Sequence, residues 1–144
     1  MNSEKKTDKT DLKVLLSTLW IVVMFNMGFA DILGLFEPGI LKQIMTGSVD
    51  DIHFTSGLML VMAIMLEIPI AMILLSRVLK FKANRWVNII AGVITIVFII
   101  GGGSTTLSYM FFATIEVVCI LFIIWYAWKW HNTEDSPNNK NLTI

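Results

Sequence analysis

The sequence predicts an all-α integral membrane protein, an antiparallel bundle of four transmembrane helices with a short outer amphipathic helix. Apolar residues make up 56% of the 144 residues and charged residues only 15%, whereas a soluble domain carries about 25% charge. Four apolar runs are long enough, or nearly so, to cross a bilayer, which takes about 20 helical residues. Ten of the eleven Lys and Arg residues fall on one side of the four crossings that these runs define.

The first thirteen residues are polar and mixed in charge, and we expect them to form a loose cytoplasmic tail. The transmembrane domain is predicted over residues 14–130, and its first span covers about 14–35. This run has the length of a full span and contains Asn26 and Asp31, with no small-residue cleavage site before them. These features argue against a cleavable signal peptide.

An irregular segment follows the first span. Pro38 should end the first helix, because proline lacks an N–H and disfavours helical conformation in the residue before it. Residues 39–46 then place apolar side chains on one helical face, which predicts a short amphipathic helix on the outer surface, ended by Gly47. The apolar side chains are Ile40, Leu41, Ile44 and Met45.

The three remaining spans are predicted at about 55–79, 86–103 and 109–130. Each must be helical, because backbone groups cannot remain unpaired in lipid. Thr55 or Ser56 can cap the second span, and Pro69 is expected to kink it. A soluble four-helix bundle would need a polar stripe on every helix, and the last two runs have none. Residues 131–144 are expected to form a loose cytoplasmic tail.

The distribution of basic residues predicts the orientation. The N-terminal segment, the connection after the second span and the C-terminal flank are basic, whereas the other side carries only Lys42. Both termini are therefore expected in the cytoplasm. Three tryptophans fall at the predicted inner interface, as indole rings prefer, and a basic cluster there is expected to contact anionic lipid headgroups. The tryptophans are Trp86, Trp128 and Trp130, and the cluster is Lys80, Lys82 and Arg85.

Three carboxyl groups lie inside the spans, on Asp31, Glu67 and Glu116, and Asn26 joins them. A charged group at the bilayer centre costs about 2.5–3.5 kcal/mol on insertion scales, so such groups face the bundle interior or pair. Each polar residue shares a helical face with small residues, which mark helix contacts in membranes. We therefore expect all four side chains in the interior, with the three carboxyl groups gathered in the outer half and Asn26 near the middle. By the same criterion, the third helix buries Asn88, Ala91, Gly92 and Thr95.

No Lys or Arg lies deep in any span, so the carboxyl groups would be neutral, share protons or bind an external cation. The leading hypothesis is a transporter-like or ligand-binding protein whose carboxylate core takes a proton, a small cation or a hydrophobic ligand. A second is a membrane enzyme that acts on a lipid-soluble substrate by proton transfer, although the balance is against an enzyme. A third is a structural or assembly subunit, in which the acids only link helices.

Other chemistry finds no support in the sequence. Asp50, Asp51 and His53 lack the spacing of a known metal site, and no metal or cofactor is predicted. The single cysteine, Cys119, allows no intrachain disulfide. The formal net charge of zero gives no reason to expect nucleic acid. The expected partner is the lipid bilayer, and a homo-oligomer is compatible with the sequence.

Three segments, Leu16 to Leu35, Leu66 to Ile89 and Tyr109 to Trp130, resemble an uncharacterised family of small bacterial membrane proteins with four predicted spans. The resemblance covers most of residues 14–130. It implies a bacterial cytoplasmic membrane and four crossings, and it brings no activity, substrate or partner. Its most distinctive pieces are EIP at Glu67–Pro69, the stretch from Ser76 to Trp86 and ATIE at Ala113–Glu116.

Overall fold

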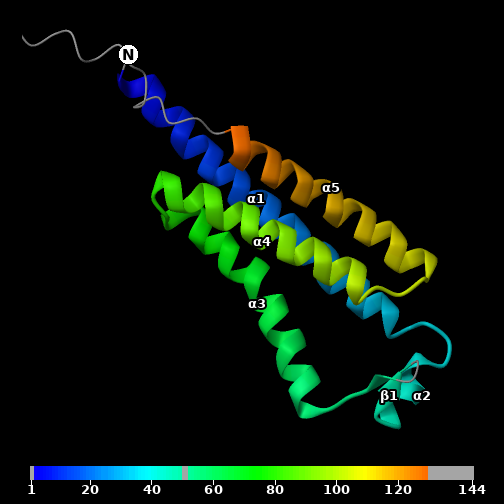
Figure 1. Cartoon of the computed structure of the whole chain (residues 1–144). Coiled ribbons are helices and arrows are strands. Elements are labelled where there is room, and N and C mark those ends of the chain that lie inside the picture. Colours follow the sequence, from blue (N-terminus) through cyan, green and yellow to red (C-terminus); the bar gives the residue numbers. More distant parts are fainter. Residues whose placement is uncertain (1, 50–51, 130–144) are drawn as a thin grey trace, which may run out of the picture.

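The computed structural model describes residues 2–49 and 52–129, with side chains from residue 10 onward. Within these residues, four helices are long and apolar enough to cross a membrane, and the chain is a membrane protein of the all-α class, as predicted. The elements are α1 (Asn2–Gly34), α2 (Ile40–Met45), β1 (Ser48–Val49), β2 (Ile52–His53), α3 (Ser56–Val78), α4 (Phe81–Gly101) and α5 (Leu107–Lys129) (Figure 1).

The four long helices form an antiparallel bundle, each running opposite to the one before it in the chain (Figure 1). Helix α1 packs against α3 and α5, and α4 packs against the same two helices from the other side. The described ends of α1 and α5 therefore meet at one end of the bundle with the α3–α4 connection. The loop that contains α2, residues 35–55, is called the outer loop after its predicted side and lies at the opposite end (Figure 1).

Helices α1 and α4 begin five or more residues before their predicted starts, and α5 begins two residues early, at Leu107. Helix α1 starts at Asn2, so the loose tail expected over residues 1–13 is wrong for residues 2–13. No Gly or Pro precedes Gly28, so nothing in the sequence stops the helix of the span from propagating toward the N-terminus. Helix α4 starts at Phe81 rather than at residue 86. The predicted C-terminal tail, 131–144, lies outside the described residues.

The outer loop contains the predicted short helix α2, which packs against β1 (Figure 1). Gly39 and Gly47 flank it with φ values of 90° and 82°, a backbone region that favours glycine. Strands β1 and β2 form a small antiparallel hairpin that the sequence did not predict; Val49 pairs with Ile52. Thr55 caps α3 as expected, because its Oγ1 accepts a hydrogen bond from the backbone N–H of Leu58 at 3.2 Å.

Helix α3 packs against the bundle along only part of its length. Its buried side chains are Pro69, Met72 and Ser76, all in the half nearer the α3–α4 connection. Residues 56–64 include no buried side chain, and Figure 1 shows this half leaning away from the other helices. Pro69 lies close to the point of divergence, where proline removes a helix hydrogen bond.

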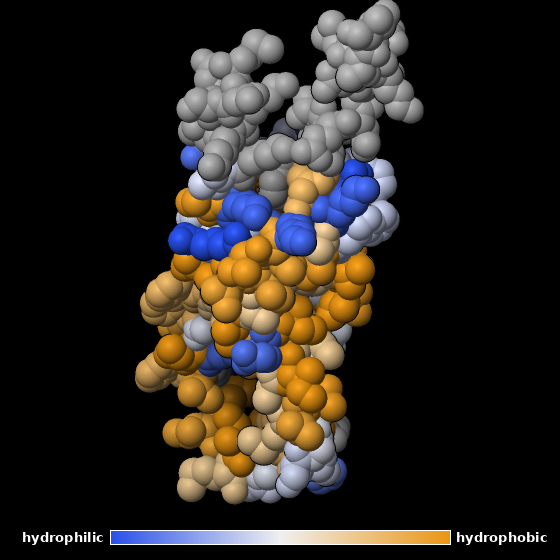
Figure 2. Space-filling model, turned by 90° about the vertical axis from the view of Figure 1, so that its left-hand side faces the viewer, coloured by the Kyte–Doolittle hydropathy of each residue, from blue (hydrophilic) through white to orange (hydrophobic). Residues whose placement is uncertain are grey.

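The centre of the bundle is a closely packed apolar core. Gly92 of α4 lets α5 approach, since a Cβ atom there would lie 2.9 Å from Ile124 Cγ1 and 3.1 Å from Ile120 Cγ2. The outward faces of the long helices are apolar as well, and Figure 2 shows a broad apolar belt on one face below a hydrophilic end. The fully buried core side chains are Leu16, Trp20, Val23, Ile120, Ile123 and Ala127.

Candidate functional site

The strongest candidate site is a pair of carboxyl groups, one on α1 and one on the neighbouring helix α5. Glu116 is only 3% exposed, on the packed side of α5 that continues through Ile120 and Ile123. Asp31, on the last turns of α1, is exposed and close enough to Glu116 for an electrostatic interaction. The hydroxyl group of Tyr109 is within electrostatic reach of both. Two acids on neighbouring helices therefore share one region of the bundle, toward the end that carries α2.

Glu116 has no partner among the described residues. No side chain there donates a hydrogen bond to it, and no Lys or Arg forms an ion pair with it. The nearby Tyr109 hydroxyl instead donates to the backbone oxygen of Ile99 at 2.8 Å. A carboxylate withdrawn from water without a partner costs several kcal/mol, so a proton or a cation should accompany it.

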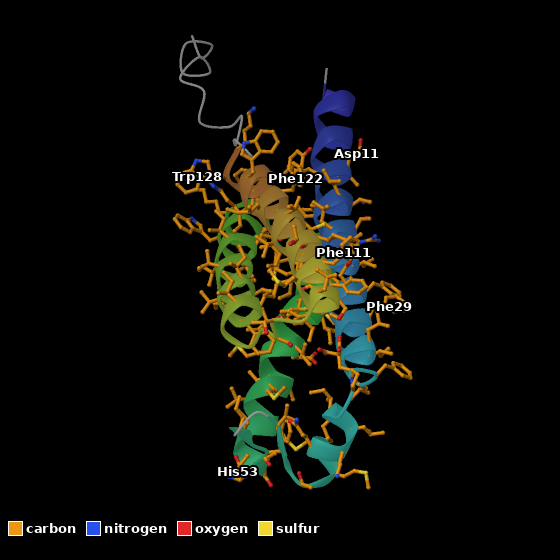
Figure 3. All side chains as sticks on the ribbon, turned by 90° about the vertical axis from the view of Figure 1, so that its right-hand side faces the viewer. Asp11, Phe29, His53, Phe111, Phe122 and Trp128 are labelled. Atoms are coloured by element: carbon orange, nitrogen blue, oxygen red, sulfur yellow. The ribbon has the colours of Figure 1, made fainter. Side chains whose placement is uncertain are left out.

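The acid pair lies near the end of the bundle that carries the outer loop. Asp31 is three residues from Gly34, the end of α1, and Glu116 is nine residues from Leu107, the start of α5. Figure 3 shows Phe29 and Phe111 at neighbouring heights on α1 and α5, and both rings are exposed. Phe29 is two residues from Asp31 and Phe111 is five from Glu116, so each ring projects from a face of its helix directed away from the acid.

The other two predicted members do not join this pair. Glu67 is exposed on the side of α3 opposite Pro69 and Met72, so the interior position expected for it is wrong. Asp31 is also more exposed than expected. Asn26 is half-buried, and its Nδ2 donates to the backbone oxygen of Val22 on its own helix at 2.8 Å. The small-residue criterion failed on α3, because its bulky Met72 faces the bundle while Ala63 is exposed.

A polar network that sequence reasoning missed lies at the other end of the bundle. Asn88 Oδ1 accepts hydrogen bonds from Trp20 Nε1 at 2.8 Å and from Ser76 Oγ at 3.1 Å. Asn88 Nδ2 donates to Asn84 Oδ1 at 2.6 Å, and Asn84 Nδ2 donates to the backbone oxygen of Ser76 at 2.7 Å. All four side chains are buried, and together they join α1, α3 and α4. The spacing of Asn84 and Asn88, four residues apart, was the available signal.

Further bonds extend this network to the edge of the bundle. Ser17 Oγ donates to the backbone oxygen of Ile73 at 2.8 Å and accepts from Arg77 Nε at 3.0 Å. Lys13 Nζ donates to the backbone oxygen of Leu79 at 2.7 Å. Hydrogen bonds therefore close the end of the bundle at which α3 turns into α4.

An apolar layer separates the network from the acid pair. On α1, Val23 and Met27 lie between Trp20 of the network and Asp31, and both are buried. On α5, Ile120 and Ile123 follow Glu116 toward the closed end and are fully buried. The bundle is thus divided along its axis into an acidic layer, an apolar layer and a hydrogen-bonded polar layer. The predicted burial of Asn88, Ala91, Gly92 and Thr95 on α4 is confirmed.

The residues expected to contact lipid headgroups lie at the closed end. Lys80 and Lys82 are exposed. The guanidinium carbon of Arg85 lies 5.5 Å from the ring centroid of Trp128, and the buried Arg85 Nε has no hydrogen-bond partner. Among the side chains described, from residue 10 onward, no carboxylate pairs with these cations, which suits anionic headgroups. Contact with lipid itself stays a prediction.

No three His, Cys, Asp or Glu side chains in the described ranges gather closely enough to hold a metal ion. Of the loop residues considered for metal, Asp50 and Asp51 lie outside those ranges, and His53 is exposed on β2 at the far end of the molecule (Figure 3).

Residues 5–136 match the model of a protein family described as "Family of unknown function (DUF6326)". The match covers α3, α4 and α5 completely and nearly all of α1. No curated protein and no solved structure matches the chain.

Proposed function

The chain belongs to this family of unknown function, DUF6326, and we propose that it is a transporter-like membrane protein that binds a proton or a cationic ligand at Glu116 and Asp31. The observation that carries the proposal is Glu116, a nearly fully buried acid without a hydrogen-bond or cationic partner among the described residues. An acid kept only to link helices would be expected to donate or accept a hydrogen bond across the interface.

The proposed location is the cytoplasmic membrane of a bacterium, with both termini and the α3–α4 connection inside. Lys13, Lys80, Lys82 and Arg85 lie at the closed end of the bundle, and Lys42 lies in the outer loop. This asymmetry supports the orientation, because basic residues are retained on the cytoplasmic side. The acid pair then lies in the outer half of the membrane.

The proposed chemistry is an exchange of one positive charge for another. In the empty site the pair retains a proton, because two ionised carboxylates cannot remain close together in a medium of low dielectric constant. A monovalent cation or a protonated amine that enters takes the place of the proton, which leaves to external water. Tyr109, whose hydroxyl group is within electrostatic reach of both acids, places an aromatic ring near the site, and this favours a cation with apolar substituents, since aromatic faces attract cations.

The proposed route to the site is from the outer end. Asp31 is exposed there, whereas the apolar layer and the Asn88 network lie between Glu116 and the closed end. Transport across the membrane would require both layers to open. In such a cycle, the described conformation would be the outward-facing state.

The test uses purified protein and ethidium, a cationic aromatic probe, in weakly buffered detergent solution. We expect ethidium binding to release about one proton per probe molecule bound. Glu116→Gln should weaken binding at least about tenfold and abolish proton release, since the amide cannot exchange a proton. The readouts are fluorescence anisotropy for binding and a pH-indicator dye for the proton.

Glu37→Gln provides the matched control. Glu37 accepts a hydrogen bond from Ser108 Oγ at 3.0 Å in the same outer region, and glutamine can still accept that bond. This variant should bind ethidium and release protons like the unchanged protein. Failure of ethidium, Na⁺ and K⁺ to bind, or equal binding by Glu116→Gln and the unchanged protein, would contradict the proposal and favour a structural role for Glu116.

A further inference from the structure

Glu67 occupies a position that the acid pair does not explain. It is the central residue of α3, eleven residues from Ser56 and eleven from Val78, or about 16 Å from either end of the helix. It is exposed, and no described side chain pairs with it. A glutamate side chain cannot reach the membrane surface over that distance, so its carboxyl group would face lipid tails, which offer no hydrogen bond.

The residues around Glu67 form a stripe with alternating spacings of three and four. This is the spacing of the seam between two helices that wind around each other. The seam residues are Leu60, Ala63, Glu67, Ile70 and Leu74. All five are exposed, with Leu60 at 62% and Leu74 at 65%, and they lie opposite the face that packs on the bundle.

We propose that this stripe is the interface with a second copy of the chain, and that α3 of the two copies packs in parallel with Glu67 opposite Glu67. Two copies inserted in the same orientation are related by a two-fold axis along the membrane normal, so each position of the seam meets itself. Two protonated carboxyl groups then form a reciprocal pair, in which each hydroxyl donates to the carbonyl oxygen of the other.

Two features of the chain favour a second copy as the occupant. The carboxyl group is self-complementary, so an identical helix satisfies its donor and its acceptor together, which lipid cannot do. Ala63, one turn from Glu67, allows close approach of two backbones beside the carboxyl pair. The outer half of α3 diverges from its own bundle, so no other helix of the same chain obstructs the seam there (Figure 1).

Cysteine cross-linking tests the interface, and the chain allows a clean design because Cys119 is its only cysteine. In a Cys119→Ser background, Ile70→Cys places a thiol on the seam, and Ile94→Cys is the matched control on α4. Ile70 is 43% exposed and Ile94 is 38% exposed. The two positions lie at the same depth. Ser76 of α3 is hydrogen-bonded to Asn88 of the antiparallel helix α4, and Ile70 lies six residues before Ser76 whereas Ile94 lies six residues after Asn88.

Copper–phenanthroline oxidation in proteoliposomes should yield at least ten times more disulfide-linked dimer from Ile70→Cys than from Ile94→Cys. Adding Glu67→Leu to Ile70→Cys should reduce the dimer at least fivefold, whereas Glu67→Gln, which keeps a donor and an acceptor, should retain it. Equal yields from the two cysteines, no dimer from Ile70→Cys, or no effect of Glu67→Leu would overturn the proposal.

A second measurement does not depend on these variants. Photobleaching of the otherwise unchanged protein, labelled at Cys119 or through a fluorescent tag, counts subunits in dilute liposomes. We expect mainly two bleaching steps per complex. One bleaching step, or three or more, would contradict a dimer through this seam. In the cross-linking experiment, a product from native membranes that is heavier than two chains would show that another protein contacts the seam.

Discussion

The Asn88 side chain links three helices. Its oxygen accepts bonds from Trp20 of α1 and Ser76 of α3, while its nitrogen donates to Asn84 of α4. An amide has two donors and two acceptor sites, and the fully buried Asn88 uses both kinds of group. Because the partners are buried too, removing this one side chain would strand several polar groups at once.

We therefore expect Asn88→Ala to lower the free energy of unfolding by about 2–4 kcal/mol, since the Trp20 and Ser76 donors lose their acceptor. Asn26→Ala is the matched control, because Asn26 bonds only to the backbone of its own helix among the described residues. Asn26→Ala should lower the free energy of unfolding by less than about 1 kcal/mol. Thermal unfolding in detergent, followed by tryptophan fluorescence, measures the effect of both variants. Equal decreases in the unfolding temperature would contradict a stabilising role for the Asn88 network.

Some of the buried polar residues could be predicted from the sequence and others could not. The burial of Glu116 could be predicted, because a carboxyl group inside a span must avoid lipid. The same rule placed Glu67 in the interior of the bundle, which is wrong. The rule requires only that protein cover the carboxyl group, and a neighbouring chain can do so as well as the chain's own helices. Ser17, Trp20 and Ser76 gave no signal, because serine and tryptophan are ordinary residues in apolar helices.

The helices themselves were more predictable than their packing. Their number and order follow from the lengths of the apolar runs, since each run must close its own hydrogen bonds in lipid. The early start of α1 was not predicted, because the polar composition of residues 2–13 was given more weight than their lack of Gly and Pro. The early start of α4 and the two-residue strands were not predicted either. The divergence of α3 from the bundle could not be derived either, although Pro69 marked the place where the helix is weakened.

Gly92 provides a test of the packing between α4 and α5. Gly92→Ala should lower the free energy of unfolding by about 1–2 kcal/mol, because the new methyl group would lie 2.9 Å from Ile124 Cγ1 and the neighbouring Ile120 is fully buried. At Gly28 of α1 a Cβ atom would meet nothing within 4 Å, so Gly28→Ala should be neutral or slightly stabilising. Calorimetry in detergent compares the two, and a tolerated Gly92→Ala would show that α4 and α5 are less tightly packed than described.

At the scale of the whole molecule, the bundle is polar and closed at one end and diverging at the other. The closed end carries the cations Lys13, Arg77, Lys80, Lys82, Arg85 and Lys129. The diverging end carries Asp31 and the outer loop with its single Lys42. The orientation of the chain therefore decides which side of the membrane the acid pair can sample.

Labelling of single cysteines tests that orientation. In a Cys119→Ser background, a membrane-impermeant maleimide added to intact spheroplasts should label Ser104→Cys, because the exposed α4–α5 connection would face outward. Lys82→Cys, exposed at the basic end, should be labelled only after the membrane is permeabilised. Labelling of Lys82→Cys in intact spheroplasts would show that the proposed orientation is wrong and that the acid pair lies toward the cytoplasm.

Helix α1 contains 33 residues and so measures about 50 Å, whereas the hydrocarbon core of a bilayer is about 30 Å thick. Even when tilted, it must project from the membrane at the basic end, with Asp31 near its other end. A rigid rod of this length turns a 10° change of tilt into a displacement of about 9 Å at its tip. If binding at Asp31 changes the tilt of α1, it would therefore displace the projecting end of the helix. A spectroscopic label on that end, in the aqueous phase, would report the displacement.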